Sequence, residues 1–309
     1  MSIVPEKTVP SKAAADYAKI SQTAILVSAL RAKYTNMPYS REIYRAVKQI
    51  TTPPLYTGTG SILSRLARFA PQSMSRVAFI ESRYLSVNQI LKNLGSDYAV
   101  VEIAAGLSAR GLEWAGSKSL YIETDLPDML SIKQQVFDKV LHEKGITQSR
   151  NHHFCPLNAL DFSNWDRLGQ RFFGDGKTKI AVVHEGLASY LSRAEKEKLR
   201  DNIGRFFRKY ASRGIWITPD FYPYENARKT WVLRLIQRRM ERKIRTKMHH
   251  FVNRDEVMEF FKLGEFQASS HDGSFIFDQV TCISKVPLNR EKIRQALARY
   301  QVYQAEYTV

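Results

Sequence analysis

The chain has 309 residues, of which 44% are hydrophobic, and its 47 Lys and Arg against 30 Asp and Glu give a formal net charge of +17. This composition can fill a substantial core and excludes a disordered chain, a collagen and a disulfide-stapled mini-protein. The two cysteines, Cys155 and Cys282, lie far apart with no metal-ligand residues nearby. They predict buried thiols in a reducing compartment and no zinc site.

Hydropathy predicts a soluble, cytoplasmic protein. No window approaches the roughly 18 uninterrupted apolar residues of a membrane helix. The start, MSIVPEKTVPSK, lacks the apolar core of a signal peptide. The positive charge is compatible with a polyanionic partner or with a solvated basic surface, and charge alone does not separate these alternatives.

The first 95 residues are expected to be helical. Apolar residues recur at three- and four-residue spacing over 11–33, which predicts an amphipathic helix, and further helices are predicted at 41–50 and 72–94. Paired prolines and two glycines in TTPPLYTGTG separate the second helix from the third. We therefore expect residues 1–95 to form a helical leader or lid on a domain that spans 96–309.

In the remainder, short apolar runs alternate with helical segments, which is typical of a parallel sheet covered on both faces. Strands are predicted at Tyr98–Ala104, Leu120–Thr124, His152–Cys155, Ile180–Val183 and Gly214–Thr218. Helices are predicted at 108–115, 127–144, 163–173 and 193–211.

After the fifth strand, a helical insertion is expected over about 220–262, with helices at 224–250 and 255–263. Two short runs, 264–268 and 274–284, are interpreted as a hairpin that closes the sheet, followed by a helix at 290–300. These elements predict a Rossmann-like α/β fold whose seven-stranded sheet is mostly parallel and has one antiparallel strand.

A turn of small residues follows the first predicted strand. In α/β sheets, ligands bind beyond the carboxyl ends of the strands, and Ala104, Ala105 and Gly106 would let the backbone approach a ligand there. Tight packing is the alternative explanation. NAD binding is disfavoured, because a G-x-G-x-x-G fingerprint is absent.

Acidic residues follow two further strands. Glu123 and Asp125 lie about 20 residues after the turn, where an acid can accept hydrogen bonds from ribose hydroxyls. The alternative is that Asp125 or Asp128 merely caps the next helix. Glu185 follows the fourth strand, where desolvation of a carboxylate favours a ligand contact, the alternative being a salt bridge to an arginine of the leader.

Together these segments resemble the leucine carboxyl methyltransferases and the related tetracenomycin-type polyketide O-methyltransferases, which have the class I fold of S-adenosylmethionine (SAM) dependent enzymes. The matching strings cover most of residues 20 to 195. They are TAILVSALRA, ESRY, VVEIAAGLSARG, YIETDLPDMLSIKQ and VVHEGLASYLS.

The resemblance implies SAM as cofactor and assigns it a set of residues. Two arginines lie near the methionine carboxylate, the small-residue turn approaches the cofactor, and an acid binds the ribose. An Asn-Ala pair lies beside the adenine, and a glutamate lines the site. In chain order the implied cofactor residues are Arg31, Arg83, Ala104, Gly106, Asp125, Asn158, Ala159 and Glu185.

Methyl transfer is an in-line displacement at an activated sulfonium, so the protein mainly has to align nucleophile and methyl carbon. A carboxylate acceptor needs no general base, whereas a phenol or alcohol can require one. His184, Tyr190, His249 and His250 are candidates by residue type only, and structural roles are favoured for the histidines. Their spacing does not indicate a metal site.

The favoured function is a SAM-dependent O-methyltransferase that acts on a small-molecule carboxylate or hydroxyl. One alternative is an RNA methyltransferase that uses the basic segment 228–250, which has nine Lys or Arg and one acid. The fourth strand argues against it, because it ends in HEGL instead of Asn/Asp-Pro-Pro-aromatic. The other alternative is a methyltransferase fold that only binds, motivated by Ala104 where the family usually has glycine.

Overall fold

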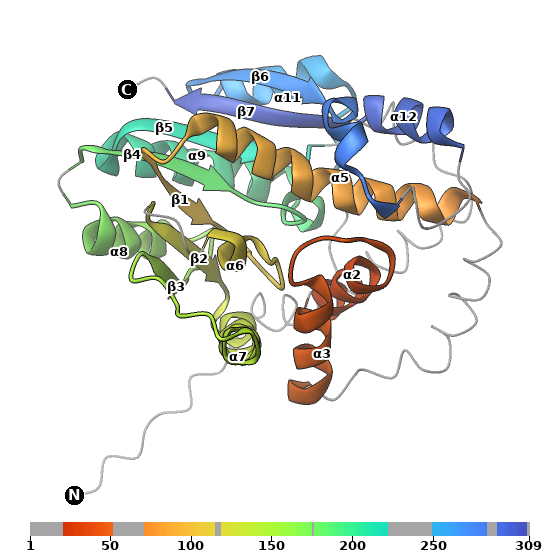
Figure 1. Cartoon of the computed structure of the whole chain (residues 1–309). Coiled ribbons are helices and arrows are strands. Elements are labelled where there is room, and N and C mark those ends of the chain that lie inside the picture. Colours follow the sequence, from red (N-terminus) through yellow and green to blue (C-terminus); the bar gives the residue numbers. More distant parts are fainter. Residues whose placement is uncertain are drawn as a thin grey trace, which may run out of the picture.

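A seven-stranded sheet organises the chain (Figure 1). The computed structural model describes residues 21–51, 71–114, 119–174, 176–221, 249–282 and 289–307. The strands lie in the order β3-β2-β1-β4-β5-β7-β6, and only β7 is antiparallel to its neighbours. Their bounds are β1 Tyr98–Glu102, β2 Tyr121–Asp125, β3 His152–Pro156, β4 Thr178–Val183, β5 Ala211–Thr218, β6 Phe266–Asp272 and β7 Gln301–Tyr307.

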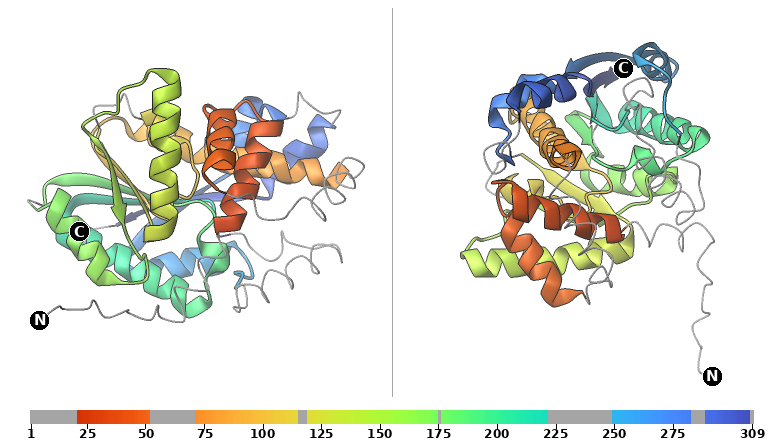
Figure 2. Two further views of the ribbon diagram at one scale, coloured as in Figure 1. Left: turned by 90° about the horizontal axis from the view of Figure 1, so that it is seen from below. Right: turned by 90° about the vertical axis from the view of Figure 1, so that its right-hand side faces the viewer.

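Helices cover both faces of this sheet, as the views in Figure 2 show. On one face, α5 packs Val87 and Ile90 against Val100 of β1 and Ile215 of β5. On the other face, a larger cluster joins α8, α9 and α11 to the sheet around Trp216. The helices are α5 Pro71–Leu94, α6 Arg110–Trp114, α7 Pro127–Lys144, α8 Phe162–Phe172, α9 Arg193–Tyr210, α11 Arg254–Lys262 and α12 Arg290–Ala298.

The leader begins, in its described part, with α2, Ser21–Tyr34, and α3, Ser40–Ile50, which precede α5. Ile43 and Val47 of α3 are buried together with Val136 and Phe137 of α7, so the leader is joined to the sheet domain by an apolar contact. Figure 1 shows α2 and α3 beside the ends of β1 and β2 where α6 and α7 begin. This location places the leader at the edge where ligands bind in α/β folds.

The parallel part of the predicted fold is confirmed. All five strands and the helices between them lie within a few residues of their predicted bounds, and the sheet has seven strands with one antiparallel. The predicted segment before residue 21 and the predicted helix at 224–250, except its last two residues, lie outside the described residues. The division of the chain at residue 95 stays a prediction.

The predicted closing hairpin is wrong. Residues Gly273–Gln279 form a 3₁₀ helix, η3, and the partner of β6 is the C-terminal strand β7. The short apolar run after residue 274 suggested a strand, but Asp272 accepts from the Ser274 N–H and starts a helical turn. Ile276 and Phe277 are then buried against α5 and α12 instead of in the sheet.

Within the described ranges, none of the helices is both long and apolar enough to cross a membrane.

Candidate active site

The turn between β1 and α6 lies at the carboxyl edge of the sheet and has an uncommon backbone. Ala104 and Gly106 both adopt left-handed conformations, with φ of 50° and 47°. The Ala105 N–H donates to the Thr124 carbonyl at 2.9 Å, and the Gly106 N–H donates to Asp125 Oδ2 at 2.8 Å. The turn is therefore fixed to the end of β2 by two backbone donors.

Asp125, the predicted ribose-binding acid, ends β2 beside this turn. Its Oδ1 accepts from the Leu126 N–H at 2.8 Å. Burial raises the pKa of Asp125, and the backbone donors at Gly106 and Leu126 only partly offset the cost of desolvation. The capping alternative is not observed, because the N-cap of α7 is Leu126, which has no side-chain capping bond.

From the sequence, both Glu123 and Asp125 are candidates to bind ribose, but their side chains occupy different places. Strand residues two apart lie on one face, but only Asp125 is at the end of the strand. The Glu123 side chain is fully buried beneath the turn, where it forms an ion pair with Lys133 and lies 2.9 Å from His152 Nε2. Glu123 is thus excluded as a direct ribose ligand.

Asn158 and Ala159, the predicted adenine pair, follow β3 at the same edge. The preceding Leu157 N–H donates to the Asp125 carbonyl at 2.9 Å, so the pair lies next to the ribose-binding acid. Asn158 is exposed, and its Oδ1 accepts from the Leu160 N–H at 3.0 Å. The Ala159 carbonyl accepts from Trp165 Nε1 at 2.9 Å, which fixes the loop to α8.

Glu185 follows β4 and lies between two arginines. It forms ion pairs with Arg31 of α2 and, at 3.2 Å, with Arg110 of α6. The Arg31 guanidinium also lies over the Tyr84 ring, 5.0 Å from its centroid. The salt bridge to the leader that the sequence offered as an alternative therefore exists, and it closes α2 over the sheet edge.

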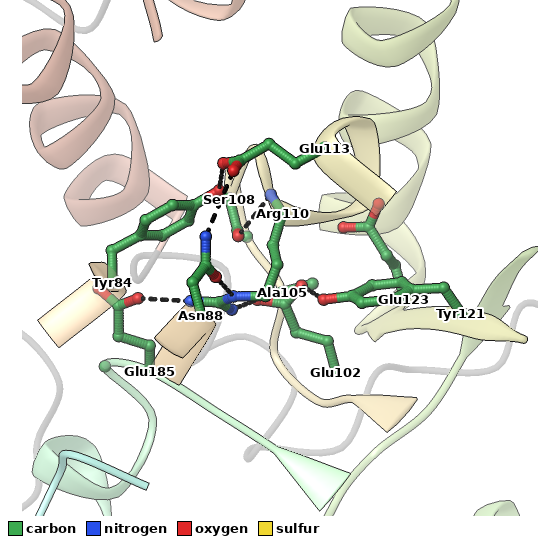
Figure 3. A network of polar contacts seen from close by, with 12 residues as sticks. Tyr84, Asn88, Glu102, Ala105, Ser108, Arg110, Glu113, Tyr121, Glu123 and Glu185 are labelled. Carbon is green, nitrogen blue, oxygen red and sulfur yellow. Dashed lines mark hydrogen bonds and ion pairs between the residues drawn. The ribbon is translucent and has the colours of Figure 1, made fainter. Parts of the chain in front are cut away.

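Arg110 is the centre of the network in Figure 3, and sequence reasoning missed it. The side chain is fully buried and forms an ion pair with Glu102, while its Nε donates to Asn88 Oδ1 at 2.6 Å. Burial opposes the charge of Arg110, but Glu102 and the neighbouring Glu185 and tyrosines together outweigh it and raise the pKa. Arg110 therefore stays cationic and helps to position Glu185.

Arg83 of α5 is separated from this network and forms an ion pair with Asp220, a second residue that the sequence did not single out. Burial opposes the charge of Arg83, yet Asp220 and the nearby Glu185 raise its pKa. Asp220 follows β5, and its Oδ2 lies 2.9 Å from His184 Nδ1. The fully buried His184 contacts the rings of Trp216 and Phe221, which agrees with the structural role favoured for it.

Asp220 also holds the turn that carries Glu185. The N–H groups of Gly186, Leu187 and Ala188 donate to its carboxylate at 2.7, 2.8 and 3.0 Å. Burial alone would raise the pKa of Asp220, but Arg83, His184 and the backbone donors lower it far below the ordinary value. This carboxylate is saturated by the protein itself.

The predicted residues thus form two adjoining groups. Gly106 contacts Asp125, and Arg31 contacts Glu185, while Arg83 is joined through Asp220 to the turn that follows Glu185. The remaining predicted residues flank the first group. They are Ala104, Asn158 and Ala159.

These groups fit the polar parts of SAM. The left-handed turn lies under α2, since a Cβ at Gly106 would lie 3.6 Å from Ala24 Cβ. Among the residues that the structure describes, the Nε atoms of Arg31 and Arg83 are buried without a hydrogen-bond partner, so both guanidinium groups have capacity for an anion. Asp125 can accept from a diol at the same edge.

Residues 24–204 match the model of the leucine carboxyl methyltransferase family, which is more than half of the chain. The chain belongs to this family. The predicted family is thereby confirmed, and the strand order with antiparallel β7 agrees with the predicted class I fold.

The matching relatives are distant. A protein named S-adenosyl-L-methionine-dependent methyltransferase dpfgK, from Gibberella zeae, is 26% identical over 125 residues. The match spans 39% of this chain and 38% of that protein, well under half of its length. Its name agrees with the cofactor that the sequence predicts.

Two solved structures show similar folds. Magnesium protoporphyrin IX methyltransferase from Synechocystis PCC 6803, with bound SAH, has 14% identity and a TM-score of 0.45, over 82% of this chain and 96% of that chain. An O-methyltransferase family protein from Burkholderia thailandensis has 13% identity and a TM-score of 0.44, over 93% and 72%. At these identities the likeness says nothing of substrate.

Proposed function

We propose that this family member transfers the methyl group of SAM to an oxygen atom of a small molecule, either a carboxylate or a hydroxyl. The observation that carries the proposal is the contact between Gly106 and Asp125, which brings a left-handed turn and a half-buried carboxylate together at the carboxyl edge of the sheet. Such an edge is where α/β folds bind nucleotide-like ligands.

The residues of this chain would hold the cofactor by its polar ends. Asp125 accepts the ribose hydroxyls, and because its desolvation is only partly compensated, two further donors would stabilise its charged form. Asn158 and Ala159 flank the adenine. Arg31 and Arg83 supply guanidinium groups for the methionine carboxylate, each exchanging part of its contact with Glu185 or Asp220.

SAM supplies a methyl group that is already activated for displacement, so alignment accounts for most of what the protein must do. The Arg31–Glu185 pair joins α2 to the end of β4 across 154 positions of sequence and would bring the leader over the reacting atoms. A leader held in this way would also exclude water from the site.

A carboxylate acceptor fits this site without a base, since it is ionised at neutral pH. A hydroxyl acceptor would require proton removal, and His184, held at Nδ1 by Asp220, is committed to the protein's own network on one side. The basic segment that motivated RNA methylation lies, apart from His249 and His250, outside the described residues. We favour a small-molecule acceptor, because the fourth strand ends in HEGL instead of the Asn/Asp-Pro-Pro-aromatic motif of enzymes that methylate base amino groups.

The test is transfer of labelled methyl groups from SAM to a panel of small carboxylates, phenols and a tRNA pool. Label in a product that mild alkali releases indicates a methyl ester, whereas alkali-stable label indicates an ether. Arg83→Ala should abolish transfer, and Arg213→Ala, which removes an exposed arginine paired with Glu306, should not. Transfer to RNA alone would contradict the proposal.

A further inference from the structure

A buried lysine lies beneath the turn that we assign to the cofactor. Lys133 of α7 is only 2% exposed, and its Nζ donates to the Ala105 carbonyl at 3.3 Å. The same Nζ forms an ion pair with Glu123 of β2. A lysine is rarely buried to this extent without a specific partner, so its place under this turn requires an explanation.

The neighbouring Ala104 needs support of this kind. A left-handed φ of 50° costs a residue with a Cβ more than it costs glycine. Such a conformation persists where the surroundings over-determine it. The peptide unit that joins Ala105 to Gly106, one residue beyond Ala104, is held at both of its polar groups. The Lys133 ammonium binds its carbonyl oxygen, and Asp125 accepts from its N–H.

We propose that Lys133 is a positioning residue that compensates for the alanine at position 104 and holds the turn in its cofactor-binding conformation. With glycine at 104 the turn would adopt the same backbone without help. This inference rests on the proposed function, because it assigns the turn to SAM.

The position of Lys133 is itself fixed by a chain of buried contacts. Glu123 lies 2.9 Å from His152 Nε2, and Gln148 Nε2 lies 3.0 Å from His152 Nδ1. Gly111 leaves the room for this arrangement, because a Cβ there would lie 1.8 Å from Glu123 Oε1. The contacts therefore run from the edge strand β3 to the turn, where the charge of Lys133 also opposes the rise that burial causes in the pKa of Asp125.

A purely structural ion pair is the competing explanation, and a second buried lysine provides the matched control. Lys196 of α9 is also 2% exposed and donates to two backbone carbonyls, those of Leu191 at 2.6 Å and His249 at 3.0 Å. No contact joins it to the turn at 104–106. Loss of either ammonium leaves buried carbonyls unpaired, so both variants should lose stability.

The experiment is a double-mutant cycle read by calorimetric titration with S-adenosylhomocysteine (SAH). We expect Lys133→Met to weaken SAH binding about tenfold, as the loss of one charged hydrogen bond would. Adding Ala104→Gly should restore the affinity to within about threefold of wild type. Lys196→Met should bind SAH like wild type, and Ala104→Gly should not change its affinity.

Two outcomes would overturn the inference: unchanged SAH affinity in Lys133→Met, or a loss that Ala104→Gly does not reverse. If Lys133→Met alone does not fold, the double variant Lys133→Met/Glu123→Gln takes its place in the cycle. This variant removes both charges of the buried ion pair. Failure of the wild-type protein to bind SAH would instead contradict the proposed function. Amide hydrogen exchange at Ala105 and Gly106 distinguishes failure of this inference from failure of the proposed function, because it needs no ligand. If Lys133 supports the turn, exchange should be faster in Lys133→Met, and adding Ala104→Gly should slow it again.

Discussion

Two turns at the same edge of the sheet are each held by an aspartate carboxylate, half-buried in Asp125 and buried in Asp220, but the electrostatics of the two carboxylates differ. Asp125 accepts from Gly106 and Leu126 and has a raised pKa, whereas Asp220 accepts from three consecutive N–H groups, Arg83 and His184 and has a pKa far below normal. A carboxylate whose desolvation is only partly compensated has capacity for a ligand. A saturated one is part of the scaffold.

The largest expected effect comes from removing the saturated carboxylate. Asp220→Ala leaves the Arg83 guanidinium and three N–H groups without their partner, and we expect a loss of about 3–5 kcal/mol of unfolding free energy. Urea unfolding measures it. Asp278→Ala removes a carboxylate that is 83% exposed and should cost less than about 0.5 kcal/mol. Equal losses of unfolding free energy in Asp220→Ala and Asp278→Ala would contradict the scaffold role of Asp220.

The stability of the protein in acid should also depend on Asp220. Because folding lowers the pKa of Asp220, its contribution is present above the ordinary aspartate pKa of about 3.9 and is lost as the pH falls toward the folded value. The unfolding free energy of the wild type should therefore decline below about pH 4, and the decline should be shallower in Asp220→Asn. Parallel curves for the two proteins between pH 5 and 3 would contradict the assignment.

Gly111→Ala tests how the buried residues Glu123 and His152 support the turn at 104–106. Its Cβ would lie 1.8 Å from Glu123 Oε1 and 2.8 Å from His152 Nε2, so these side chains must shift. We expect a loss of about 1–3 kcal/mol in urea unfolding, together with weaker SAH binding. Gly95→Ala is the matched control. Its Cβ would have no atom within 4 Å, but its φ is 78°, so the substitution adds only backbone strain and should leave the SAH affinity unchanged.

The smallest effect concerns the turn itself. Ala104→Gly relieves a left-handed alanine and should stabilise the protein by about 1 kcal/mol, whereas Gly106→Ala introduces the same strain and should destabilise it by a similar amount. Thermal unfolding at constant pH gives both signs. Two changes of the same sign would mean that packing, and not backbone conformation, controls this turn.

Sequence position alone predicted the residues that immediately follow strands. Asp125 and Glu185 were found because parallel strands end at one edge, so an acid directly after a buried run must lie there. Asp220 follows β5 after Thr218 and a proline and looked like an ordinary loop residue. Its role depends on the proximity of the β4 and β5 ends, which no local pattern encodes.

Buried charges on helices were missed for a similar reason. Arg110 and Lys133 have the spacing of helix surface residues, and only tertiary packing encloses them with Glu102 and Glu123. The hairpin prediction failed because the short apolar run after Ser274 resembled a strand, whereas the true partner of β6, Gln301–Tyr307, lies beyond α12. Local periodicity does not specify which segments pair across such a distance.

The most direct test of the central claim is calorimetric titration of the wild-type protein, Asp125→Ala and Asp128→Ala with SAH. Asp128 is a matched control, since it is an exposed carboxylate three residues along the chain. If the turn and Asp125 hold the cofactor, the wild type and Asp128→Ala should bind with a micromolar dissociation constant, and Asp125→Ala should show no binding. Equal binding by all three proteins, or none by the wild type, would contradict the assignment of this edge to the cofactor.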